Sequence, residues 1–81
     1  MQPYAKIYDP ATLYELMQWF VQRRGQFPET LTLDAGFEIF ELPATIERYL
    51  ELLPTVRENP TFGPQLHHLF RIRALLEAQG L

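Results

Sequence analysis

The segment TLTLDAGFEIF, residues 30–40, restricts the fold most strongly, because it alternates apolar and polar residues on both sides of a turn signal. Leucine alternates with threonine before the signal DAG, and apolar residues alternate with Glu38 after it. Such alternation is typical of half-buried strands. DAG suits a hairpin loop in which Gly36 adopts the left-handed conformation. The segment therefore predicts an antiparallel hairpin. The alternative is one helix across residues 33–42, which the glycine and the nearby threonines disfavour.

Three other segments, residues 9–25, 42–54 and 64–80, carry helical patterns with start and stop signals. In the first, Asp9 can cap the free amides of the first turn, and Gly25 suits the position after the last turn. In the second, apolar residues repeat at helical spacing before a proline that should end the helix. A proline opens the third segment and a glycine closes it. We therefore expect three helices.

The segment YAKIY, Tyr4–Tyr8, is rich in strand formers and predicts a short additional strand. The expected fold is then α+β, in β-α-β-β-α-α order, with a short antiparallel hairpin packed on three helices. Residues 1–81 should form a single small globular domain. Cysteine is absent, which excludes disulfides and zinc ribbons or fingers as supplements to a small core. Oligomerisation or a protein partner is the supplement that remains open.

The charge balance and the missing nucleophiles exclude several classes of function. Seven basic and 10 acidic residues give a net charge of −3, which argues against a dedicated nucleic-acid binder. Serine and cysteine are absent, and no phosphate-binding or dinucleotide-binding glycine motif occurs. We therefore expect a non-catalytic protein without a cofactor. The first residues, MQPYAKIYDP, do not resemble a signal peptide, and no apolar run reaches membrane-spanning length, so we expect a cytoplasmic protein.

Two adjacent histidines, His67 and His68, raise the question of a metal site. Neighbouring residues on a helix point about 100° apart, so these two rings cannot readily share one ion. A helical zinc pair prefers a spacing of four, and Arg71 and Ile72 occupy those positions. We expect ordinary surface or half-buried histidines and no bound metal. A metal shared across a symmetric dimer, or a small molecule at His67, is the alternative.

The third helix carries apolar residues over a wider arc than the roughly 100° stripe of a surface helix. The first helix places its only tryptophan outside its own apolar stripe. Tryptophan and arginine are frequent at binding hot spots. These features predict a partner interface made of Trp19, Leu69, Ile72, Arg73, Leu76 and Glu77. The alternative is that Arg73 lays its stem along the core with its charge in water, while Trp19 lies over the core's flank.

The sequence as a whole favours a non-catalytic protein–protein interaction module, such as a small cytoplasmic adaptor, assembly or regulatory factor. Its 11 aromatic residues, one Trp, four Tyr and six Phe, exceed what one small core requires. The partner would be another protein or a second copy in a homodimer. The alternative is a nucleic-acid-associated regulator with an arginine patch made of Arg23, Arg24, Arg71 and Arg73. Phosphate contacts would make binding steeply salt-dependent, whereas an apolar interface would not.

Overall fold

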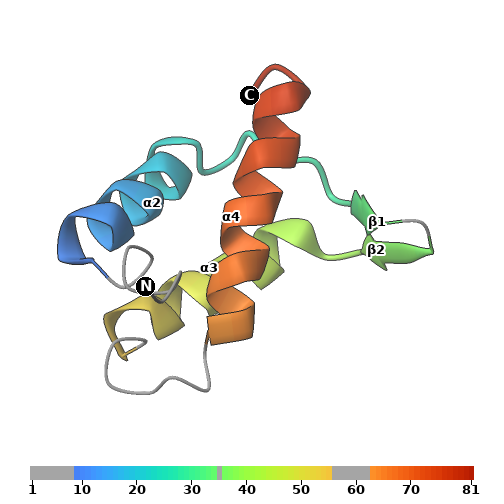
Figure 1. Cartoon of the computed structure of the whole chain (residues 1–81). Coiled ribbons are helices and arrows are strands. Elements are labelled where there is room, and N and C mark those ends of the chain that lie inside the picture. The colour runs from blue at the N-terminus through green and yellow to red at the C-terminus, as the bar shows by residue number, and fades with distance from the viewer. Residues whose placement is uncertain (1–8, 35, 56–62) are drawn as a thin grey trace.

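The computed structural model describes residues 9–34, 36–55 and 63–81, which form helices and one hairpin (Figure 1). The elements in chain order are α2 (Pro10–Gln22), β1 (Leu31–Asp34), β2 (Phe37–Ile39), α3 (Leu42–Leu52), the 3₁₀ turn η1 (Leu53–Thr55) and α4 (Gly63–Ala78). This arrangement confirms the expected α+β class and the order of the three helices and the hairpin. The strand expected at Tyr4–Tyr8 lies outside the described residues.

Helix α2 begins and ends at the predicted signals. The Asp9 carboxylate accepts a hydrogen bond from the Thr12 amide at 3.1 Å, which satisfies one of the free donors of the first turn. Arg23 forms the C-cap, and its amide donates to the carbonyl of Phe20. Gly25 follows with a φ of 84°, a left-handed conformation that costs glycine little.

The hairpin is antiparallel, as predicted, and the single-helix alternative is wrong. Leu31 pairs with Ile39 and Thr32 pairs with Glu38, and an irregularity follows Thr32. Gly36 has a φ of 80° at the turn. This register places the apolar members of both strands on the same face of the ribbon.

Helices α3 and α4 also end where the sequence predicted. Helix α3 ends at Leu52 and passes into η1 at Leu53, directly before Pro54, which has no amide hydrogen to continue the helix. Two backbone hydrogen bonds from the residues after helix α4 close its C-terminal end. The Leu81 amide donates to the Leu76 carbonyl at 3.0 Å, and the Gly80 amide donates to the Glu77 carbonyl at 3.0 Å. Together they form a Schellman motif, which satisfies carbonyls that the helix end would leave free.

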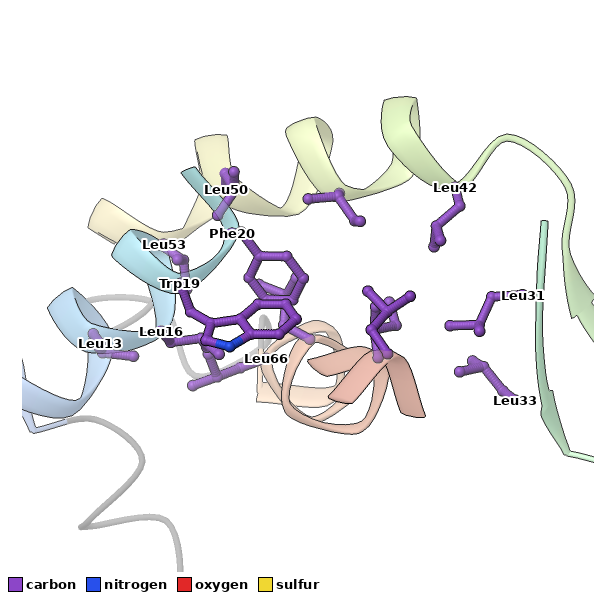
Figure 2. Close-up of a cluster of buried hydrophobic side chains, with 14 residues drawn as sticks. Leu13, Leu16, Trp19, Phe20, Leu31, Leu33, Leu42, Leu50, Leu53 and Leu66 are labelled. Atoms are coloured by element: carbon purple, nitrogen blue, oxygen red, sulfur yellow. The ribbon is translucent and has the colours of Figure 1, made fainter. Parts of the chain in front are cut away.

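One apolar core joins all these elements, and α4 lies at its centre. Figure 2 looks along α4, with α2, α3 and β1 on three sides of it. Leu31 and Leu33 point from β1 toward α4, and Phe20 and Leu50 approach it from the other two elements. The buried core residues are Leu13, Leu16, Trp19, Phe20, Leu31, Leu33, Leu42, Ile46, Leu50, Leu53, Leu66, Leu69, Ile72 and Leu76. Within the described part of the chain, no helix has the length and apolar character needed to cross a bilayer.

Candidate functional site

The apolar residues predicted to form an interface lie in the core of a single chain. Leu69 and Leu76 are each 1% exposed, Ile72 is 0% exposed and Trp19 is 7% exposed. The expectation that Leu69, Ile72 and Leu76 form an uncovered side of α4 is therefore wrong. The reason is the central position of α4. Helices α2 and α3 and strand β1 lie on three sides of it (Figure 2), which leaves Phe70 and Leu75 only partly buried and Ala74 exposed.

Trp19 packs against two arginines of its own chain. The Arg23 guanidinium carbon lies 4.3 Å from the centroid of the indole ring, and that of Arg73 lies 5.5 Å from it. Arg23 also donates to the Trp19 carbonyl at 3.0 Å. Cations at these distances are attracted to the negative face of the ring. We call Trp19, Arg23 and Arg73 the tryptophan clamp.

The two charged residues predicted for the interface, Arg73 and Glu77, form an ion pair beside Trp19. The Nε of Arg73 lies 3.5 Å from a carboxylate oxygen of Glu77, one turn along α4, and its Nη2 lies 3.5 Å from Glu15 on α2. The Arg73 side chain is 23% exposed, whereas that of Glu15 is 72% exposed. The Arg73 guanidinium therefore lies over the Trp19 ring and is also paired with the carboxylates of Glu77 and Glu15 at the surface. This is the alternative placement considered from the sequence.

The four arginines of the nucleic-acid alternative all have partners within the chain. Arg24 makes two hydrogen bonds of 2.8 Å to the carboxylate of Glu47, and these raise the pKa of Arg24 above its ordinary value. Arg71 donates to the Leu33 carbonyl at 3.1 Å. Arg23 and Arg73 belong to the tryptophan clamp. Carbonyls, carboxylates and an indole ring thus hold these side chains, and the arrangement gives the phosphate-binding alternative no support.

The two histidines have different surroundings. His67 is exposed, and His68 is half-buried between two aromatic rings. The His68 ring centroid lies 6.4 Å from that of Phe37 and 6.3 Å from that of Tyr49, and its Nδ1 lies 3.4 Å from the Tyr49 hydroxyl. Among the residues that the structure describes, no group of three His, Asp or Glu side chains could hold a metal ion.

Large exposed hydrophobic side chains gather on the hairpin. Phe37 is 50% exposed and Phe40 is 68% exposed, and the exposed residue Glu38 stands between them in the chain. We call Phe37, Glu38 and Phe40 the hairpin surface. The ring of His68 continues it toward α4. Sequence reasoning missed this surface, although the adjacent pair of Ile39 and Phe40 was a usable signal, since it interrupts the strand alternation.

A second apolar feature lies between α2 and η1. A cavity of about 270 Å³ is lined by Leu13, Tyr14, Met17, Leu53 and Pro54. Tyr14 at this cavity is 62% exposed. Ligand sites usually combine apolar walls with a few converging polar groups, and this lining offers only the tyrosine hydroxyl. The cavity can hold an apolar side chain, but it has little with which to orient a small molecule.

Comparison with known proteins identifies a family for this fold and this surface. No curated protein and no solved structure matches the chain. One family model does match, over residues 11–78, from the first turn of α2 to the last residue of α4. The match therefore covers the hairpin surface, the tryptophan clamp and most of the chain. On this evidence the chain belongs to the family described as a domain of unknown function, DUF6965.

Proposed function

We propose that this chain is a non-catalytic protein-binding module whose partner docks on the hairpin surface. The exposure of Phe37 and Phe40, 50% and 68%, is the observation that carries the proposal. Aromatic side chains contribute much of the apolar area of protein interfaces and are costly to leave in water. Two exposed aromatic side chains three residues apart, Phe37 in β2 and Phe40 just after it, offer anchors of the kind that an interface needs.

The proposal keeps the class of function expected from the sequence, but it places the binding surface on the hairpin instead of on α4 and Trp19. Leu69, Ile72 and Leu76 hold the chain together, so they have no area to offer a partner. The hairpin surface has the composition of an interface instead. Its aromatic residues lie beside the exposed carboxylates of Glu38 and Glu41, and interfaces commonly combine an apolar centre with a charged rim.

The use of hydroxyl groups also supports a non-catalytic role. The Thr12 hydroxyl lies 3.4 Å from the Asp9 carboxylate at the start of α2, and the Thr55 hydroxyl donates to the Leu52 carbonyl at 3.0 Å. These contacts stabilise the ends of helices. An activated nucleophile instead requires a base beside its hydroxyl, held by a third group.

Affinity capture with the full chain tests the proposal. The wild type is compared with a variant carrying Phe37→Ser and Phe40→Ser, and with a control carrying Tyr14→Ser. Tyr14 is exposed to a similar extent but lies on α2. We expect a specific protein to be captured by the wild type and the control, cross-linked at the hairpin, and lost from the double variant. Capture that is equal for all three proteins, or that is absent from all three, would contradict the proposal.

A further inference from the structure

Among residues 9–34, 36–55 and 63–81, strand β2 pairs only with β1, so it is an edge strand within the described part of the chain. On the other strand, Arg71 of α4 donates to the Leu33 carbonyl at 3.1 Å. At the base of the hairpin, the Leu42 amide donates to the Glu29 carbonyl at 2.9 Å. For Phe37–Ile39, no backbone hydrogen bond to another described element accompanies the pairing with β1. Figure 1 shows the hairpin projecting away from the helices. An open edge is a template on which another extended chain can pair.

The charged residues of the hairpin segment itself are all acidic, whereas Arg71 of α4 lies on the β1 side. Between Arg24 and Arg48 the sequence holds five acidic residues and neither lysine nor arginine. Of these, Glu29, Glu38 and Glu41 are exposed, and they form no ion pair within the described residues. The exposed carboxylates in β2 and beside it, Glu38 and Glu41, attract cationic groups to this side of the hairpin.

These charges oppose pairing of β2 with a second copy of the chain. If two β2 strands paired in antiparallel fashion about their central residue, Glu38 of one copy would face Glu38 of the other. Like charges directly opposite each other destabilise a sheet. Short strands and charged residues are the devices by which proteins block self-pairing of edges, and β2 has only three residues. The edge is thus suited to a different chain of opposite charge.

We propose that β2 binds an extended basic segment of a partner protein, which adds as a third strand to the hairpin. This inference rests on the proposed function and specifies the chemistry of the partner. Successive side chains on a strand alternate between faces, so Glu38 lies on the opposite face from Phe37 and Ile39. The matching segment carries lysine or arginine where it faces Glu38, and apolar side chains at the flanking positions where it meets Phe37. Main-chain hydrogen bonds supply affinity, and this alternation supplies specificity.

Selection from a phage library of randomised twelve-residue peptides, on the immobilised full chain, tests the inference. We expect enriched peptides to alternate basic with apolar residues. In titrations with a synthetic selected peptide, Glu38→Lys should weaken binding by roughly tenfold, since an attractive cross-strand pair becomes repulsive. Replacing the facing cation of the peptide with glutamate should restore binding to that variant. N-methylation of peptide amides should abolish binding at alternate positions only, because only every second amide faces β2.

Matched controls separate this inference from the proposed function. Glu38 is exposed, so unchanged far-ultraviolet dichroism is expected for Glu38→Lys. The strand-addition inference would be overturned if the selected peptides showed no preference for basic residues. It would also be overturned if Tyr14→Ser abolished peptide binding while Glu38→Lys retained it. A protein captured through Phe37 and Phe40 without any basic extended peptide would overturn it also, and would leave the proposed function standing. Failure of both the capture and the selection would overturn both.

Discussion

Replacement of Ile72 by alanine should remove a large share of the stability of this chain. Ile72 is 0% exposed, on the helix that α2, α3 and β1 surround. A protein of 81 residues has an expected free energy of unfolding of about 4–12 kcal/mol, at 0.05–0.15 kcal/mol per residue. The loss of one fully buried aliphatic side chain is therefore comparable to the lower end of the total.

The size of the effect follows from the carbons removed. Isoleucine has three more carbons than alanine, and about 0.8 kcal/mol for each buried carbon gives about 2.4 kcal/mol. The cavity left behind adds to this cost, because surrounding helices relax only partly. We expect a destabilisation of about 3–4 kcal/mol for Ile72→Ala. The conservative change Ile72→Val should cost only about 1 kcal/mol.

Urea denaturation followed by far-ultraviolet dichroism measures this loss. With a slope of about 1 kcal/mol per molar, as expected for a small domain, the midpoint should fall by about 3–4 M. Leu75→Ala is the matched control on the same helix, since Leu75 is half-buried and should cost less. A loss below about 1 kcal/mol for Ile72→Ala would refute the placement of Ile72 in the core. A folded Ile72→Asp variant that only loses a partner would refute it as well.

Three further outcomes test the helix end, the turn and the histidines. Asp9→Ala should destabilise the chain by about 1 kcal/mol in urea denaturation, through loss of the cap on Thr12, and a value near zero would contradict the capping role. By the same measurement, Gly36→Val should destabilise the chain by more than about 1 kcal/mol, because a β-branched residue is strained at the Gly36 φ of 80°. The control Gly36→Asn should destabilise it less. Unchanged stability of Gly36→Val would refute this backbone strain. Elemental analysis should find no stoichiometric transition metal, and one equivalent per chain or per dimer would overturn the interpretation of His67 and His68 as ordinary residues.

The parts of the fold that the sequence predicted are those set by neighbours in the chain. The cap at Asp9, the turn at Gly36 and the helix end at Gly80 each depend on a few consecutive residues. Backbone conformations of this kind follow from local sterics and hydrogen bonding, which the residue types determine. The hairpin also followed from local alternation, which puts Leu31 and Leu33 on one face, whereas the irregularity that pairs Asp34 with Phe37 was not predicted.

The interface prediction failed because the exposure of α4 depends on packing between distant segments. Apolar residues spread widely around a helix are compatible with an interface and with complete burial. The choice depends on whether other elements surround the helix, and Leu69, Ile72 and Leu76 show that they do. The same limit applies to Phe40, whose 68% exposure depends on how the chain bends after β2 toward α3.

The tryptophan clamp provides an intrinsic fluorescence probe of the packing between helices. Trp19 is the only tryptophan, and its two guanidinium neighbours come from the C-cap of α2 and from α4. Arg23 also reaches the Leu81 carbonyl, at 3.4 Å, so the ring lies where two helices and residue 81 meet. Its fluorescence therefore follows the separation of α2 from α4, whereas circular dichroism follows the helices themselves. Coincidence of the two transitions is a direct test of whether the helices melt and separate in one cooperative step.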